Sequence, residues 1–185
     1  MKILVFFIGL FFSIETVFSQ DVKIAEPEFI GVVLYVNDTI GTGVKLEQQT
    51  AFVTTKSNAA SYVPFARVVA GKAKSKNAVN GSSSPVKIDK REKIRFIIKA
   101  ANNSTDPTTI INIFKLTREK DQRTIELASA GTFGGVKTGD IEYIPFNGKK
   151  YGNSSYLIEI DAMEQGEYAI TLAERRDLFH LFCIE

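Results

Sequence analysis

The chain has 185 residues, enough for one domain with a sizeable core, and its hydrophobic (44%) and charged (24%) contents are those of a folded protein. One cysteine, Cys183, excludes an intramolecular disulfide. One histidine, His180, excludes zinc, copper or haem sites that take two histidines from one chain. We therefore expect neither a metal nor a cofactor.

Residues 1–19 are typical of a secretory signal peptide. Lys2 provides a positive charge, residues 3–12 (ILVFFIGLFF) form an apolar run of ten, and residues 17–19 (VFS) place small or medium side chains where signal peptidase reads. The alternative is an uncleaved anchor, but ten apolar residues are too few to cross a bilayer, which takes roughly 20. We expect cleavage after Ser19 and an exported protein, periplasmic, cell-surface or extracellular, without a transmembrane segment.

The rest of the chain predicts a short lead-in followed by one domain. Residues 20–27 are polar and indicate a loose lead-in to a single domain over residues 28–185. Residues 71–84 (GKAKSKNAVNGSSS) have the composition of a loop or linker. A domain boundary at that point would leave only about 50 residues before it, too few for an independent core. We therefore expect one domain with a mobile loop.

Short runs with period-two alternation recur along the domain and predict strands. Turn signals separate them every eight to twelve residues, which is typical of a β-sandwich rather than of βαβ units. In residues 93–100 (KIRFIIKA), apolar and mostly basic faces alternate, which predicts a half-exposed strand. Asn147-Gly148 predicts a turn. The predicted strands are residues 28–36, 44–46, 51–55, 62–70, 85–88, 93–100, 109–116, 123–128, 141–145, 155–160, 168–172 and 178–184.

Residues 156–171 (YLIEIDAMEQGEYAIT) contain two strand-like runs that flank a connection at Gly166. The order Met163, Gly166, Tyr168 resembles the tyrosine corner of immunoglobulin-like and fibronectin-III-like sandwiches. The resemblance implies that Tyr168 is buried and that its hydroxyl bonds to backbone near Met163 or just before it. Paired cysteines and a core Trp are missing, which excludes true antibody domains. We predict an all-β antiparallel sandwich, immunoglobulin/fibronectin-III-like or jelly-roll-like, with about ten strands.

Three stretches of the last third of the chain, KYGNSSYLIEI, GEYAI and the ending LFHLFCIE, resemble a group of proteins. These are uncharacterised secreted bacterial β-sandwich proteins, in which a GEYA corner precedes an apolar, Phe-containing closing strand. The resemblance implies an exported β-sandwich. It brings no activity and no catalytic residues.

Two short patterns point to chemistry and are better explained structurally. His180 and Cys183 are three residues apart in a predicted strand, so their side chains point to opposite faces and cannot form a Cys–His pair or a metal half-site. Residues 131–140 (GTFGGVKTGD) resemble a phosphate-binding loop, but Val136 stands where glycine must precede the lysine. We interpret the first pair as a partly buried histidine with an inert thiol, and residues 131–140 as a flexible loop between strands.

Carboxylate pairs remain open, because the two acids of a glycoside hydrolase can lie far apart in the chain. The candidates Glu142, Glu159 and Asp161 fall on the solvent side of predicted strands, which favours surface charge. The G-x-S-x-G and HExxH motifs are absent. The sequence favours a non-catalytic protein for ligand or surface binding at the cell envelope. The alternative is a glycan-active hydrolase that uses a carboxylate pair.

A basic stretch covers residues 67–99, where ten Lys and Arg face two acids, while the rest of the chain is net acidic. It could bind an anionic polysaccharide or an envelope protein; the alternative, which we favour, is that lysines protect a sheet edge. No aromatic residue is interleaved before Phe96, which disfavours nucleic acid. The candidate anion-binding residues are Lys72, Lys74, Lys76, Lys87, Lys90, Arg91, Lys93, Arg95 and Lys99.

Overall fold

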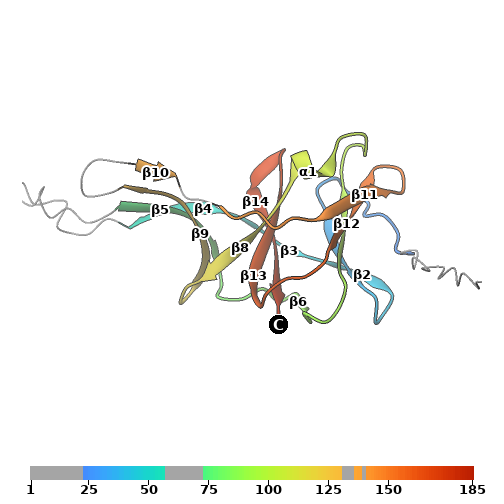
Figure 1. Cartoon of the computed structure of the whole chain (residues 1–185), viewed down its shortest axis with the longest axis horizontal. Helices are drawn as coiled ribbons and strands as arrows, with labels where there is room; N and C mark the ends of the chain where they lie inside the picture. The colour runs from blue at the N-terminus through green and yellow to red at the C-terminus, as the bar shows by residue number, and fades with distance from the viewer. Residues whose placement is uncertain (1–22, 57–72, 131–135, 139–140) are drawn as a thin grey trace, which may run out of the picture.

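The computed structural model describes residues 23–56, 73–130, 136–138 and 141–185, and these residues confirm the all-β prediction (Figure 1). They contain fourteen strands, more than the expected ten or so, and one short helix. The strands are β1 (Val33–Asn37), β2 (Thr42–Lys45), β3 (Glu47–Thr50), β4 (Phe52–Lys56), β5 (Ala73–Asn80), β6 (Lys87–Ile88), β7 (Ile94–Lys99), β8 (Ile111–Arg118), β9 (Gln122–Ala130), β10 (Val136–Thr138), β11 (Asn147–Tyr151), β12 (Ser155–Ile160), β13 (Gly166–Leu172) and β14 (Arg175–Ile184). The helix is α1 (Pro107–Ile110), which Asp106 caps by accepting from Thr108 N.

The strands form two sheets that pack face to face. The smaller sheet has the order β11-β12-β7-β1-β2, and the larger has the order β3-β14-β13-β8-β9-β5-β4, with β10 on β9 and β6 on β14. Pairing is antiparallel except for β6, which runs parallel to β14. Between the sheets, the rings of Phe96 and Phe182 lie 4.9 Å apart, and Tyr168 stacks on Phe182 at 5.6 Å. This interface is the main core of the sandwich.

The larger sheet curls so far that its two ends meet. β3 and β4 stand at opposite ends of the strand order, yet only Ala51 separates them in the chain. The Gln49 amide joins β3 to β5 by accepting from Asn80 N (2.9 Å) and donating to Asn80 O (3.1 Å). Strands β8, β13 and β14 are apolar on both faces, so the concave side of the curl encloses a second core. Its buried residues are Val79, Phe114, Leu116, Ala169, Phe179 and Leu181.

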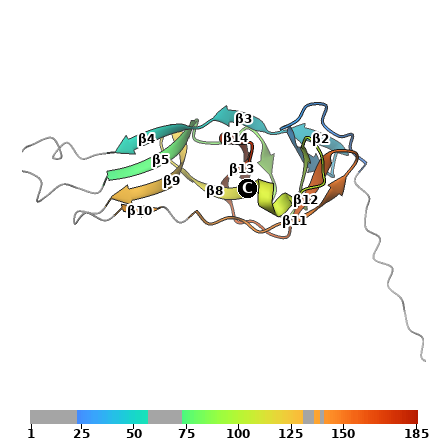
Figure 2. The same ribbon diagram turned by 90° about the horizontal axis from the view of Figure 1, so that it is seen from above.

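Strands β4, β5, β9 and β10 lie side by side and extend beyond the sandwich as an arm (Figures 1 and 2). The arm corrects the expectation of a loop over residues 71–84, because Ala73–Asn80 is a strand paired with β4 on one side and β9 on the other. The Lys and Ser residues of this segment give it the composition of a linker. Its backbone N–H and C=O groups nevertheless form hydrogen bonds with two neighbouring strands. The predicted strand at residues 62–70 lies outside the described residues.

The expectation of a half-exposed strand at residues 93–100 was wrong. β7 lies in the middle of the smaller sheet, and even its outward-facing side chains are covered: Ile97 is 0% exposed and Arg95 is 6% exposed. Ile97 packs with Val36 and Leu157 in a small cluster on the outer face, which Ile24 helps to cover. The strand is therefore buried on both faces.

The lead-in over residues 23–27 is docked rather than loose. Tyr151 donates its hydroxyl to Ile24 O. The Glu26 carboxylate accepts hydrogen bonds from Asn153 N (2.6 Å) and Ser155 Oγ (2.6 Å), and it pairs with Lys99 Nζ at 3.1 Å. These contacts bind the segment to the β11–β12 turn and to β7, which explains how it covers the outer face.

Several predicted element boundaries also differ. Asn147-Gly148 begins strand β11 instead of forming a turn. The predicted strand over residues 28–36 begins only at Val33. The predicted strand at residues 141–145 reduces to one bridge, between Tyr143 and Phe114. No helix among the described residues is long and apolar enough to cross a membrane.

Candidate functional site

The concave side of the curled sheet opens into a pocket with a cavity volume of about 400 Å³. Its lining comes from β5, α1, β8, β9, β13, β14 and the segment that precedes β11. The apolar lining consists of Phe114, Ile125, Leu127, Ile141, Tyr143 and Phe179. The polar lining consists of Asn77, Thr109, Asn112, Thr171 and Arg176. A pocket of this size, in which polar groups converge beside apolar side chains, is a candidate small-ligand site.

The pocket exists because two neighbouring strands separate. β8 and β9 pair only at Thr117–Thr124 and Arg118–Arg123, after which β9 continues into the arm. The segment around Ile144 runs beside β8, where Ile144 N donates to Ile113 O at 2.8 Å. The pocket lies between β8 and β9, where this segment does not fill the space between the two strands.

Strand alternation places the polar and aromatic groups of β8 on the same side. Asn112 and Phe114 are two residues apart, so both face the concave side. Thr171 is the direct partner of Asn112 in the antiparallel pairing of β13 with β8. Directly opposite residues project to the same face of a sheet, so the Thr171 hydroxyl lies next to the Asn112 amide at the pocket wall.

Three aromatic rings of the lining contact one another. Phe114 meets Phe179 edge to face at 5.4 Å and 78°, and it meets Tyr143 at 6.3 Å and 77°. These distances and angles are favourable for aromatic pairs. Phe179 is 2% exposed, whereas Tyr143 is 54% exposed. Tyr143 therefore offers aromatic surface to a bound molecule at the pocket mouth.

Four polar side chains of the pocket have no partner among the described residues: Asn77, Asn112, Thr171 and Arg176. Thr109, in contrast, donates its hydroxyl to Asp106 O at 2.8 Å. Arg176 is the one charged side chain among the described residues that line the pocket, whereas its neighbour Arg175 pairs with Asp177. The pocket thus combines open hydrogen-bonding groups with one uncompensated positive charge.

Sequence reasoning did not identify these pocket residues. The available signal was Asn112, a polar residue on the apolar face of the run TIINIFKL. Asn77 fell in the stretch interpreted as a loop, and nothing in the local pattern distinguishes Thr171 or Arg176.

A second group of charged side chains lies at the other end of β13. The Glu167 carboxylate is 1% exposed and accepts from Arg118 Nη2 at 2.6 Å and from Ser84 N at 2.9 Å. Burial raises the pKa of Glu167, but hydrogen bonds from Ser83, Arg118 and Ser84 outweigh it and hold the pKa below the usual range. A catalytic acid needs a raised pKa. Glu167 is therefore suited to a structural role.

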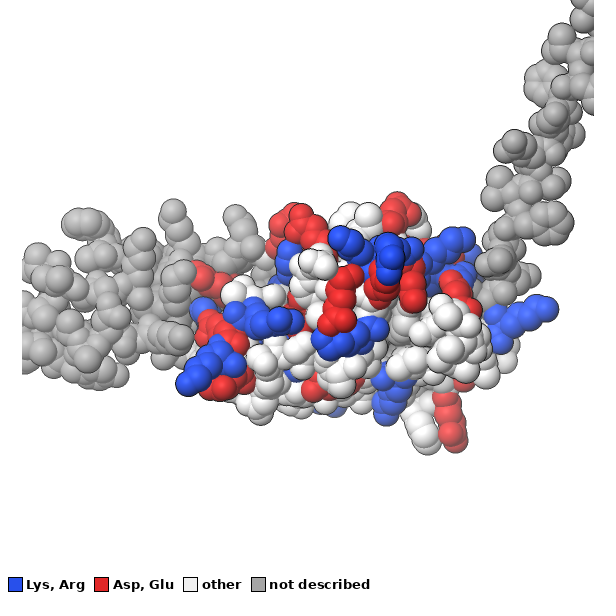
Figure 3. Space-filling model, turned by 90° about the horizontal axis from the view of Figure 1, so that it is seen from below, with Lys and Arg blue, Asp and Glu red and all other residues white. Residues whose placement is uncertain are grey.

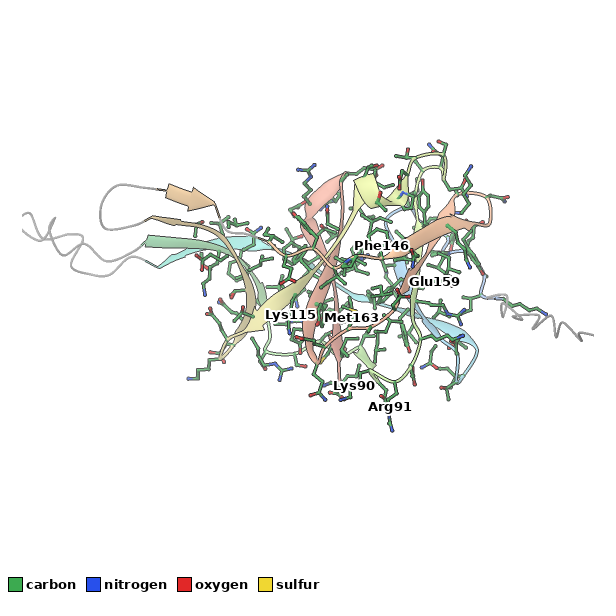
Figure 4. The ribbon with its side chains drawn as sticks, viewed as in Figure 1. Lys90, Arg91, Lys115, Phe146, Glu159 and Met163 are labelled. Carbon is green, nitrogen blue, oxygen red and sulfur yellow. The ribbon has the colours of Figure 1, made fainter. Side chains whose placement is uncertain are left out.

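The structure does not bring the three candidate catalytic carboxylates together. Glu142 lines a hollow of about 500 Å³ with Glu126 and Lys115 on the larger sheet. Glu159 lies on β12 of the smaller sheet, where its carboxylate is 3.4 Å from Lys149 Nζ, and Asp161 is exposed. In Figure 4, Glu159 lies away from Lys115, which lines the hollow together with Glu142. Glu126 lines the same hollow as Glu142, although nothing in the local sequence pattern distinguishes Glu126.

The structure places the three residues of the corner motif as follows. Tyr168 is 2% exposed, and its hydroxyl donates to Glu164 O at 2.9 Å, so the acceptor lies one residue after Met163. Met163 packs against the main core, and Gly166 begins β13. The hydroxyl thus ties β13 to the connection from β12.

His180 and Cys183 are both buried in β14. His180 is 1% exposed, so it is more completely buried than the sequence predicted. Its Nδ1 lies 3.3 Å from Gln48 Nε2. Burial, with a smaller effect of Lys45, lowers the pKa of His180 to about 4. Burial also raises the pKa of the Cys183 thiol, which disfavours the reactive thiolate.

The candidate anion-binding residues do not form one positive surface. Lys72 and the side chain of Lys74 lie outside what the structure describes. Five of the others form ion pairs: Lys76–Glu119, Lys87–Glu185, Arg91–Asp89, Arg95–Asp38 and Lys99–Glu26. Lys90 and Lys93 have no ion pair among the described residues, and Figure 4 places Lys90 beside Arg91 at the lower edge. In Figure 3, basic and acidic side chains interleave on the face shown.

Edge protection does not explain the basic stretch either. β5 and β7 carry much of it, and each is paired on both sides within its sheet. The lysines and arginines of these strands, as far as the structure describes their side chains, pair with carboxylates from distant parts of the chain. Their local excess of positive charge is compensated by the fold.

No protein-family model, no curated protein and no solved structure matches this chain. The resemblance to secreted bacterial proteins stays a prediction, and function is inferred from the geometry of the chain itself.

Proposed function

We propose that this protein is an exported, non-catalytic binding protein of the cell envelope, with its ligand site in the pocket of the curled sheet. The observation that carries the proposal is a set of four polar side chains, Asn77, Asn112, Thr171 and Arg176, which have no partner in the described part of the chain and which line the pocket together with aromatic rings. None of their polar atoms is among the buried atoms that lack a partner in the described residues, so they are open to solvent and a ligand can replace water with hydrogen bonds of its own.

The chemistry of the lining supports binding rather than catalysis. General acid–base catalysis needs a group that exchanges a proton near the working pH, most often His and otherwise Asp, Glu, Lys, Tyr or Cys. Tyr143 is the one group of this kind among the described residues that line the pocket. The described lining therefore offers no pair of side chains to act as acid and base. Its other polar groups can hold and orient a molecule.

Export is the second part of the proposal and rests on the apolar run of residues 3–12 behind Lys2. An exported protein meets glycans, peptides and other surface molecules. It can hold these as a free ligand or as one unit of a longer chain that enters the open pocket.

The test is a binding screen with the chain that begins at Gln20. The isotope-labelled protein is titrated with neutral and charged sugars, short peptides and small carboxylic acids, and backbone amide resonances are followed. We expect at least one class to shift the resonances of Asn112, Tyr143 and Thr171 together. If none of the classes shifts them, the pocket is not a ligand site and the proposal fails.

The alternative, a glycan-active hydrolase, is favoured by one observation: Glu126 and Glu142 share the hollow of about 500 Å³. Paired carboxylates are what glycoside hydrolysis uses. Chromogenic glycosides would test this alternative. Turnover that disappears in both Glu126→Gln and Glu142→Gln would establish the hydrolase and overturn the non-catalytic proposal.

A further inference from the structure

We infer that the pocket of the curled sheet binds a carboxylated sugar, with the sugar carboxylate at Arg176. This inference rests on the proposed function, because it names the ligand class of the same site. Three independent features of the lining carry it: the charge of the pocket, the kind of hydrogen-bonding groups it offers, and the exposed aromatic ring.

The charge of the pocket selects an anion. Arg176 is exposed and has no carboxylate partner among the described residues, and no acidic side chain among them lines the pocket. A guanidinium group presents its donors in a planar fork that matches the two oxygens of a carboxylate. Arg175 differs from Arg176 in this respect, because its Nε already lies 3.2 Å from Asp177 Oδ1. Of the two arginines that begin β14, Arg176 is the one without an ion pair among the described residues, and it can therefore bind a ligand carboxylate.

The neutral polar groups select a ligand with several hydroxyls. An Asn amide offers two donors and an acceptor, and a Thr hydroxyl both donates and accepts. Sugar hydroxyls also donate and accept, so they can satisfy Asn77, Asn112 and Thr171 together. A fatty acid would satisfy Arg176 but would cover these three groups with hydrocarbon. Covering polar groups without giving them partners lowers affinity.

The aromatic ring selects a ligand with a flat apolar face. Tyr143 is 54% exposed, and its ring is held by its edge-to-face contact with Phe114. A pyranose ring has C–H groups that can lie against such a surface. The cavity volume of about 400 Å³ lies within the range of pockets that take small ligands, roughly 300–1,000 Å³. One sugar unit with its carboxylate can therefore be accommodated.

The test compares four probes that separate these features: glucuronate, glucose, acetate and octanoate. The chain that begins at Gln20 is titrated with each probe while amide resonances are followed. We expect glucuronate to bind about tenfold more tightly than glucose or acetate, because only glucuronate supplies both the ring and the charge. Octanoate should bind more weakly than glucuronate.

Two matched variants locate the carboxylate. Arg176→Gln should weaken glucuronate binding about tenfold and leave glucose binding unchanged. Arg175→Gln removes the same charge one residue away and should change neither. Both arginines are exposed, so both variants should fold, which the amide spectrum checks.

The outcomes separate this inference from the proposed function. Equal binding of glucose and glucuronate, with no effect of Arg176→Gln, would overturn the carboxylated-sugar inference and leave a ligand site. Tighter binding of octanoate than of glucuronate would do the same. If none of these probes shifts the pocket resonances, the inference fails; the proposed function fails with it only if the wider screen is also silent.

Discussion

The carboxylate of Glu167 lies 3.6 Å from Nη1 of Arg123, and both side chains are 1% exposed. Arg123 also donates to Glu47 at 3.2 Å and to Asn80 O at 3.0 Å, so one buried guanidinium joins β9, β13, β3 and β5. Nη1 itself has no hydrogen bond in the described structure. The curled sheet is therefore connected across its interior by charge as well as by its apolar core.

Removal of one partner of this group should be costly. Glu167→Gln leaves Arg123 buried with less compensation, and we expect the free energy of unfolding to fall by about 3 kcal/mol. Urea denaturation measures it. Asp89→Asn is the control, because it breaks an exposed pair with Arg91 and should cost much less than the loss of the buried pair. An equal decrease in the free energy of unfolding in the two variants would show that the buried pair stabilises the fold no more than the exposed pair does.

The lowered pKa of Glu167 adds a pH dependence with a defined sign. The folded state holds the pKa of Glu167 below its ordinary value of 4.5, so the ionised carboxylate stabilises the fold above that pH. The contribution is lost as the pH falls below 4.5 and the group protonates. Glu167→Gln should therefore flatten the acid limb of the stability curve, as measured by thermal unfolding between pH 3 and pH 7. An unchanged acid limb would contradict the assignment.

His180 should remain neutral well below its ordinary pKa. Its folded pKa is about 4 against 6.5 for a free imidazole, so the unfolded chain binds the proton first. Stability associated with His180 is complete above pH 6.5 and declines as the pH falls towards 4. Because the chain has one histidine, a single imidazole resonance reports this titration directly. A midpoint near 6.5 in the folded protein would contradict the burial of His180.

The Tyr168 hydroxyl should contribute measurably to stability. Tyr168→Phe removes its hydrogen bond and leaves Glu164 O without this donor, so we expect a loss of about 1 kcal/mol in the free energy of unfolding. Tyr143→Phe is the matched control, because that ring is 54% exposed and its hydroxyl has no partner among the described residues. Chemical denaturation of both variants gives the comparison. A Tyr168→Phe variant as stable as the control would indicate that the bond has no net effect.

The Glu26 carboxylate should hold the lead-in to the β11–β12 turn. Hydrogen bonds from Ser155 and Asn153 N are the main causes that lower its pKa to about 2. The contact is therefore complete above pH 4.5 and is lost as the pH falls towards 2. Glu26→Gln should speed hydrogen exchange at the amides of Asn153 and Ser154 at neutral pH, whereas Glu28→Gln, an exposed control, should not. Unchanged exchange in Glu26→Gln would show that the lead-in is held by its apolar contacts alone.

Local pattern was sufficient for the class of fold and for much of the strand content. Period-two alternation identified β7, β8, β12, β13 and β14, because side-chain alternation is a property of each strand by itself. The bond of Tyr168 to Glu164 spans four residues, so its neighbourhood could also be anticipated from sequence. Composition misled where it conflicted with pairing: Ala73–Asn80 has the residues of a linker, yet two neighbouring strands make it a strand.

The pocket depends on relations that no local pattern contains. Asn77, Asn112, Tyr143 and Arg176 are separated by more than 30 residues from one another and meet only because β8 and β9 separate within a sheet whose ends close at Ala51. The cover over Ile97 likewise depends on the lead-in, whose Ile24 packs against the same cluster and whose Glu26 bonds residues of a turn far along the chain. Alternation tells which side chains share a face of one strand. Which strands are neighbours, and what covers each face, follows from the free energy of the whole packed chain.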